Sequence, residues 1–251
     1  MKMRFFIHNP IRNRSRGPFR PALILLSLFI LILAGCGGGE RDRLTVIHTN
    51  DLHGHILPER VLGWPVRTGG YGVLAAWIKD VRARNETEGI PTLLLDAGDI
   101  FTGTVEGNET RGQAIIRLMN ALGYDAMTVG NHEFDLGYYV LQRLAEEADF
   151  PLLGANIVRK ESGESLPFLR PYIIRDFDGL KVAVIGVTTD EVGEITMPGN
   201  VDRVFFRDPV KVVRTYLKIL GDDGVDLVIV LSHLGLDADR RLAEETGDID
   251  L

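Results

Sequence analysis

Short, almost wholly apolar runs alternate with amphipathic stretches along most of this chain, and that alternation constrains the fold more than any other feature. Runs such as Thr92–Leu95 and Leu180–Val187 are typical of strands that are buried on both faces of a sheet. Between such runs, stretches such as Tyr71–Arg84 repeat apolar residues at helical spacing. Strands that lack a polar face and alternate with helices predict an α/β fold with buried sheets.

The alternation can be divided into individual elements. An Asp178-Gly179 turn separates two apolar runs and predicts an antiparallel pair, so we expect mixed strand pairing. Gly123 is expected to end the helix that precedes it. The predicted strands are 44–49, 92–95, 125–129, 151–157, 172–175, 180–187 and 225–231, and the predicted helices are 71–84, 111–122, 136–148, 208–220 and 237–245. No repeat or Pro-rich linker interrupts 44–251, which is therefore expected to form one domain.

The first 36 residues are typical of a lipoprotein leader. They contain six basic and no acidic residues. Residues 22–34 are almost wholly apolar but fall short of the roughly 20 residues that a spanning helix needs. The segment ends in Leu33-Ala34-Gly35-Cys36, which resembles a bacterial lipobox whose cysteine is lipidated. Residues 37–43 are then expected to form a flexible tether, and the protein to be held outside the cytoplasm by a lipid anchor in the cell envelope. An ordinary signal peptide with an incidental cysteine is the alternative.

The charge balance disfavours nucleic acid as a partner. Removal of the leader would leave 22 basic against 35 acidic residues, a net charge of −13. No basic run remains that could neutralise a nucleic-acid backbone. An acidic protein can still accept anionic phosphate esters where metal ions supply the local positive charge.

Polar residues that can bind metal ions follow several predicted strands, at the strand ends where open α/β sheets bind ligands. Asp51 and His53 follow the first strand and, two residues apart in an extended segment, could reach one ion. Asp99 follows the next strand. Gly98 before it permits a sharp turn, and the Asp99 carboxylate could bridge two cations.

Two later strand ends carry the remaining candidates. Asn131 and His132 follow 125–129. Because they are adjacent, their side chains are expected to diverge, so that Asn131 can bind a metal while His132 faces a substrate. His233 follows 225–231. His48, His55 and Asp96 lie nearby, but as a core, a rim and an orienting residue they are not assigned as ligands.

Four strings carry a resemblance to a known family. They are Ile47-His48-Thr49-Asn50-Asp51-Leu52-His53-Gly54, Asp96-Ala97-Gly98-Asp99, Gly130-Asn131-His132-Glu133-Phe134-Asp135 and Ser232-His233-Leu234-Gly235. Together they resemble the calcineurin-like metallophosphoesterases, and within these the bacterial 5′-nucleotidase / cyclic-nucleotide phosphodiesterase family. The resemblance covers about 44–251 and implies a mixed β-sheet sandwich flanked by helices.

The resemblance also implies a role for each candidate residue. Asp51 and His53 would hold a first divalent metal ion, Asp99 would bridge two ions, and Asn131 and His233 would hold the second. Carboxylate, amide oxygen and imidazole ligands suit Zn²⁺, Mn²⁺ or Co²⁺, and the sequence does not choose among them.

A catalytic dyad is implied as well. His132 and Asp135 are three residues apart, so the start of a helix can place both on one side, with the carboxylate orienting the imidazole. In the implied mechanism, water activated by two cations attacks phosphorus, while protonated His132 stabilises the transferring group or protonates the leaving oxygen.

The chain departs from the family at its C-terminal end. In the family, a strand after the His233 region leads into a Gly-Gly-His-x-His string that gives one histidine to each metal, whereas this sequence ends at Leu251. We therefore expect a domain that is C-terminally incomplete, with weak metal binding and little hydrolysis by residues 1–251 alone. A fragment of a longer protein is the favoured explanation, and a short natural product that has lost activity is the alternative.

The expected function is a metal-dependent phosphoester hydrolase that acts on extracytoplasmic nucleotides. Two alternatives remain. One is a thiosulfohydrolase of the kind used in sulfur oxidation, built on the same scaffold. The other is a non-catalytic surface lipoprotein, against which an intact pair of His132 and Asp135 argues.

Overall fold

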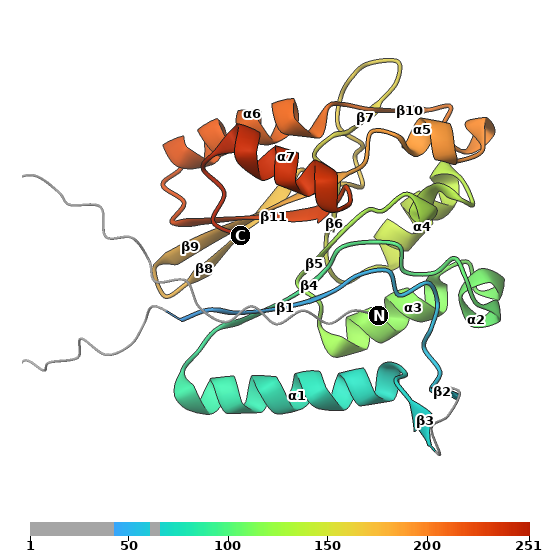
Figure 1. Ribbon diagram of the computed structural model, residues 1–251, viewed down its shortest axis with the longest axis vertical. Coiled ribbons are helices and arrows are strands. Elements are labelled where there is room, and N and C mark those ends of the chain that lie inside the picture. Colours follow the sequence, from blue (N-terminus) through green and yellow to red (C-terminus); the bar gives the residue numbers. More distant parts are fainter. Residues whose placement is uncertain (1–42, 61–65) are drawn as a thin grey trace, which may run out of the picture.

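Two β-sheets face each other, and helices cover the outer face of each sheet (Figure 1). This computed structural model describes residues 43–60 and 66–251. The predicted leader and nearly all of the predicted tether lie outside the described residues. Parallel and antiparallel pairs both occur, which confirms the predicted mixed α/β fold.

The first sheet is parallel throughout. Its strand order is β1-β4-β5-β6, so each strand pairs with the next strand of this sheet along the chain. Between successive strands, a helical connection brings the chain back to the end of the sheet where the next strand begins. Parallel strands that are joined in this way bring their carboxyl ends to one edge. The strands are β1 (Thr45–Thr49), β4 (Thr92–Asp96), β5 (Ala126–Thr128) and β6 (Leu152–Leu153).

The second sheet combines a hairpin with a parallel strand. β8 (Tyr172–Phe177) and β9 (Leu180–Thr188) are antiparallel, and β11 (Leu227–His233) pairs with β9 in parallel. Asp178 and Gly179 between β8 and β9 both have positive φ, as a two-residue hairpin turn requires. The predicted turn is thereby confirmed.

Three apolar clusters hold these layers together. One lies between the two sheets and includes Leu93 and Leu95 of β4 with Val182 and Val184 of β9. The other two lie between each sheet and its helices. The helices on the first sheet include α1 (Tyr71–Glu88), α3 (Gln113–Leu122) and α4 (Tyr138–Glu147), and those on the second are α6 (Pro209–Asp222) and α7 (Leu236–Thr246).

Helix ends follow the local sequence. Gly123 adopts the left-handed conformation and ends α3, as expected. The Asp208 side chain accepts a hydrogen bond from the Lys211 backbone N–H, and Pro209 occupies the first turn, so α6 begins with a conventional cap. In the part of the chain that is described, no helix has both the length and the apolar composition needed to cross a bilayer.

The prediction of one strand over 151–157 was wrong. The chain forms two short strands there, β6 and β7 (Ile157–Arg159), and β7 pairs with β10 (Val204–Phe206) in a separate ribbon. Between them the backbone leaves the first sheet, because Ala155 N–H bonds to Gly186 of the second sheet. This departure from the first sheet depends on β9, a strand about thirty residues further along the chain.

Several short elements were not predicted. Each is only a few residues long, too short for periodicity to be visible. They are β2 (Glu59–Arg60), β3 (Arg67–Thr68), α2 (Val105–Glu109), η1 (His132–Phe134), α5 (Val192–Ile195), η2 (Pro198–Asn200) and the strand β10.

Candidate metal centre

The candidate residues converge at the carboxyl ends of β1, β4, β5 and β11. Asp51 and His53 follow β1, Asp99 follows β4, and Asn131 follows β5. His233 is the last residue of β11 rather than a residue beyond it. The two sheets therefore contribute to a single site at their common edge.

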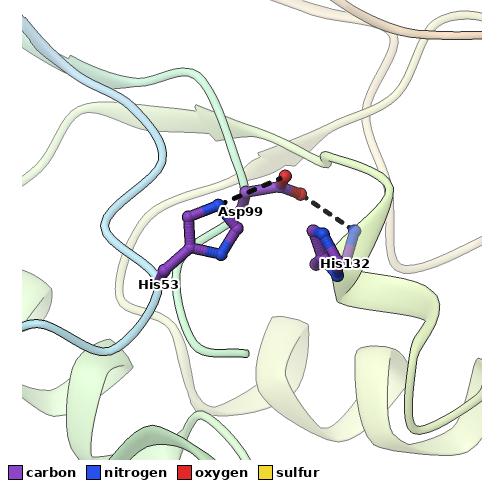
Figure 2. A group of neighbouring side chains, drawn as sticks. All are labelled: His53, Asp99 and His132. Atoms are coloured by element: carbon purple, nitrogen blue, oxygen red, sulfur yellow. Dashed lines mark hydrogen bonds and ion pairs between the residues drawn. The ribbon is translucent and has the colours of Figure 1, made fainter. Parts of the chain in front are cut away.

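Asp99 is the centre of the cluster and is only 3% exposed. Its Oδ1 accepts a hydrogen bond from the His132 backbone N–H at 2.9 Å. Its Oδ2 lies 3.1 Å from His233 Nε2 and 3.9 Å from His53 Nε2. Figure 2 shows the Asp99 carboxylate between His53 and His132. One carboxylate thus faces imidazoles that come from three different segments.

Two overlapping groups have the composition of a metal site. One contains His53, Asp99 and His132, the other contains Asp51, Asp99 and His233, and in each group the candidate ligand atoms lie within 4.8 Å of one another. Asp99 belongs to both groups. Carboxylate and imidazole donors are the set that Zn²⁺, Mn²⁺ and Co²⁺ accept, so the residues present fit binding of divalent metal.

Asn131 and His132 point to different partners, as their adjacency predicted. Asn131 Oδ1 lies 3.1 Å from His233 Nε2. The His132 ring instead meets the His53 ring edge-on, with 5.1 Å between centroids. The Asn131 amide oxygen therefore contacts His233, whereas the His132 imidazole contacts His53.

Backbone carbonyls fix the orientation of two imidazoles. His53 Nδ1 lies 2.7 Å from the Thr102 carbonyl oxygen, and His233 Nδ1 lies 2.6 Å from that of Ala97. A carbonyl oxygen can only accept, so each Nδ1 must carry the proton and donate it. Each Nε2 is then the ring atom that can bind a cation, which for His233 requires that Nε2 first release its proton; this is the usual arrangement of metal-binding histidines.

The electrostatics of the cluster couple His233 to Asp99. Burial alone would lower the pKa of His233, but the hydrogen bond and negative charge of Asp99 raise it to about 9. Burial would likewise raise the pKa of Asp99, but His233 and His132 hold it below its usual range. The protonated His233 ring and the Asp99 carboxylate therefore stabilise each other's charge.

His132 and Asp135 form a hydrogen-bonded pair, with 2.6 Å between Nδ1 and Oδ2. His132 is the first residue of the short helix η1, and Asp135 directly follows that helix, so both side chains lie on one side. Burial lowers the pKa of His132, but the hydrogen bond that its ring donates to Asp135 and the charge of Asp99 raise it overall. The Asn200 side chain donates to the Asp135 backbone oxygen at 2.7 Å and so ties the segment that follows the dyad to η2.

The backbone at this site is strained. Asp51, His53 and Asp99 have φ values of 52°, 48° and 61°, and they are three of the five non-glycine residues with positive φ in the described ranges. Such residues cost on the order of 1–3 kcal/mol each and persist only where the surroundings enforce them. The candidate ligands are therefore held where the chain would not place them by itself.

Two glycines allow the ligand segments to approach closely. A Cβ on Gly98, which has φ of +91°, would lie 2.5 Å from the Gly130 backbone nitrogen. A Cβ on Gly130 would lie 2.3 Å from Asp99 Oδ1. Any side chain at either position would push the segments after β4 and β5 apart.

Sequence reasoning missed Glu133 and left Asp96 with only a general orienting role. Glu133 is fully buried, and its carboxylate binds backbone amides of the Asp99 segment. Its place inside the Gly130–Asp135 string was the one available signal. Asp96 accepts a hydrogen bond from the Gly98 N–H at 2.9 Å and so does orient a neighbour.

Two other histidines stay outside both metal-site groups. His48 is half-buried within β1, and burial lowers its pKa. His55 pairs with Glu59 on the exposed surface. Neither residue gains a role as a ligand from the structure.

Comparison with known proteins gives consistent results. A family model described as calcineurin-like phosphoesterase matches residues 44–251. A 5′-nucleotidase of Vibrio cholerae is 37% identical over 223 residues, which are 84% of this chain and 39% of the relative. This chain therefore spans about two fifths of that relative's length.

Solved structures show the same likeness. A 5′-nucleotidase precursor from Thermus thermophilus is 37% identical with a TM-score of 0.72, and the match covers 80% of this chain and 39% of that one. The sulfate thiohydrolase of the same organism is 25% identical with a TM-score of 0.75, covering 82% of this chain and 46% of that one.

Proposed function

The chain belongs to the calcineurin-like phosphoesterase family, and on that premise we propose that it is a two-metal hydrolase of nucleotide phosphoesters that acts outside the cytoplasm. The observation that carries the proposal is the Asp99 carboxylate, which is shared by two groups of potential ligands. A carboxylate common to two groups is the feature expected of a bridging ligand in a two-metal site.

The residues divide into ligands and a proton donor. As the family resemblance implies, Asp51 and His53 would bind one ion, Asn131 and His233 the other, and Asp99 both. His53 Nε2 lies 3.7 Å from Asp51 Oδ1, although Asp51 also groups with His233, and His53 with His132. Ions bound there would activate water as a nucleophile and withdraw charge from the phosphoryl oxygens. The carbonyls of Thr102 and Ala97 keep the histidine Nε2 atoms available for this role.

His132 would act on the substrate. Asp135 accepts from its Nδ1 and favours the protonated ring, so Nε2–H can be donated. A donor there can stabilise negative charge on the transferring phosphoryl group or protonate the leaving oxygen. Because Asp135 stays hydrogen-bonded to Nδ1, the ring keeps its orientation while its proton is transferred.

Nucleotides are favoured over thiosulfonate esters on the evidence of the relatives. The 5′-nucleotidases of Vibrio cholerae and Thermus thermophilus are each 37% identical to this chain, whereas the sulfate thiohydrolase is 25% identical. A location outside the cytoplasm, with a lipid on Cys36, is supported by the basic, apolar and lipobox-like pattern of residues 1–36. Metabolic labelling with palmitate tests the anchor, because Cys36→Ser would abolish incorporation of the label.

Metal-dependent phosphate release is the decisive assay. The purified protein is incubated with AMP and with Mn²⁺, Zn²⁺ or Co²⁺, and the rate is compared with that in chelator. We expect release that is small for residues 1–251 alone but depends on the metal and is abolished by Asp99→Asn. Leu220→Ala, in α6 and in the apolar cluster between the second sheet and its helices, should retain the metal dependence.

The alternatives give different outcomes in the same experiment. Sulfate release from a thiosulfonate ester in place of phosphate release from AMP would favour the thiosulfohydrolase. Phosphate release that is indifferent to chelator and to Asp99→Asn would overturn the proposal, and ligand binding without turnover would favour the non-catalytic lipoprotein.

A further inference from the structure

Glu133 is a fully buried acidic residue for which the proposed mechanism has no use. It lies in η1, between His132 and Phe134. Its Oε2 accepts hydrogen bonds from the backbone N–H groups of Asp99 at 2.9 Å and Gly130 at 2.7 Å, and its Oε1 accepts one from Ile100 at 2.8 Å. One side chain thus joins the segment after β4 to the segment after β5.

Asp99 and Ile100, which donate to Glu133, also hold the segment after β1 through their backbone carbonyls. The carbonyl of Asp99 accepts from the His53 N–H at 2.9 Å, and that of Ile100 accepts from the Gly54 N–H at 2.8 Å. The Asp99 and Ile100 residues therefore donate to Glu133 and accept from the His53 segment. A displacement of Glu133 would be passed through them to all three segments that bear candidate ligands.

These segments need such support because their backbone conformations are unfavourable. His53 and Asp99 both have positive φ. A strained residue of this kind relaxes when its surroundings no longer determine it. The Asp99 peptide has its N–H fixed by Glu133, while the Asp99 side chain is fixed by the His132 N–H.

We propose that Glu133 is a positioning residue that sets the spacing of the metal-binding side chains by holding these three segments together, without itself binding the metal. The inference rests on the proposed function, since it concerns the same metal centre. A carboxylate suits the task because it offers only acceptors, whereas an amide would direct N–H groups at one of the backbone donors.

Metal affinity is the readout that separates positioning from a purely structural role. Mn²⁺ binding to the metal-free protein is measured by calorimetry for the unaltered protein, Glu133→Gln and Leu220→Ala. We expect Glu133→Gln to bind Mn²⁺ about 10- to 100-fold more weakly, the range found when groups that orient metal ligands are altered. Leu220→Ala is the matched control because Leu220 is also fully buried but lies in the cluster between α6 and the second sheet.

A spectroscopic signature adds a second readout. The visible absorption of bound Co²⁺ reports the geometry of its ligands, so it should change in Glu133→Gln and stay unchanged in Leu220→Ala. Equal Mn²⁺ affinities, within twofold, for Glu133→Gln and the unaltered protein would overturn the inference, as would a loss of affinity in Leu220→Ala as large as that in Glu133→Gln.

Amide hydrogen exchange on the unaltered protein keeps the inference testable if Glu133→Gln fails to fold. In the metal-free protein, the amides of Asp99, Ile100 and Gly130 should exchange as slowly as those in the middle of β4. Exchange of these three amides as fast as that of exposed loop amides would show that Glu133 does not hold them. If the unaltered protein binds none of Mn²⁺, Zn²⁺ and Co²⁺, the proposed function fails, and the exchange result still decides whether Glu133 holds the three segments.

Discussion

Replacing Asp96 by Asn should stabilise the protein, and more strongly as the pH rises. Asp96 is 1% exposed. Its Oδ2 accepts from the Thr49 hydroxyl at 2.6 Å and its Oδ1 accepts from the Gly98 N–H at 2.9 Å. Burial, only partly offset by these hydrogen bonds, raises the pKa of Asp96 to about 7. The folded protein therefore prefers the protonated acid, which an asparagine mimics in size and in hydrogen bonding.

The size of the effect follows from linkage. Below the unfolded pKa of about 3.9, Asp96 is protonated in both the folded and the unfolded state, so its ionisation costs no stability. Between that value and about 7 only the unfolded state ionises, so stability falls by about 1.4 kcal/mol per pH unit. Above about 7 the loss is complete, at roughly 4 kcal/mol. Between pH 5 and pH 8, the advantage of Asp96→Asn should therefore grow by about 3 kcal/mol.

Urea unfolding in the presence of chelator measures this difference. The free energy of unfolding is determined for the unaltered protein and for Asp96→Asn at several pH values from 5 to 8. Leu220→Ala is the control, because it introduces and removes no titrating group and its effect should not depend on pH. An advantage of Asp96→Asn that stays constant over this range would refute the reasoning, since it would mean that Asp96 is ionised in the folded protein throughout.

Three further predictions concern the dyad, the core and the metal. Asp135→Asn should lower phosphate release from AMP about 10²-fold, because it removes the charge that raises the pKa of His132. The loss should be smaller at pH 6 than at pH 8, and an equal loss at both pH values would contradict this. Phe134→Ala should lower the free energy of unfolding by about 3–5 kcal/mol, since the ring is fully buried edge-on against Phe206, and a loss below about 1 kcal/mol in urea unfolding would contradict it. Mn²⁺ binding near pH 7 should release about one proton, from His233 with its pKa of about 9, so the calorimetric enthalpy should depend on the buffer; an enthalpy independent of the buffer would count against it.

The sequence was sufficient for most of the elements and for the convergence of the candidate site residues. Apolar runs and helical spacing act over a few residues, so the strands that begin near Thr92 and Leu180 and the helix that begins at Tyr71 were predicted close to their observed bounds. The meeting of Asp51, Asp99 and His233 was also predicted, because parallel strands bring the residues at their carboxyl ends to one edge of the sheet. The local pattern failed at 151–157, where a contact with Gly186 decides that the strand breaks.

Tertiary structure decided how the site residues are held. Nothing in the residues around Glu133 indicates that its carboxylate binds the amides of Asp99 and Ile100, more than thirty positions away. The positive φ of His53 and Asp99 is likewise unfavourable locally, and it persists because hydrogen bonds between segments enforce it. The sequence by itself determined which donor atoms the site contains. Only the packing of the two sheets determined their spacing and charge, because both depend on contacts between segments that are far apart in the chain.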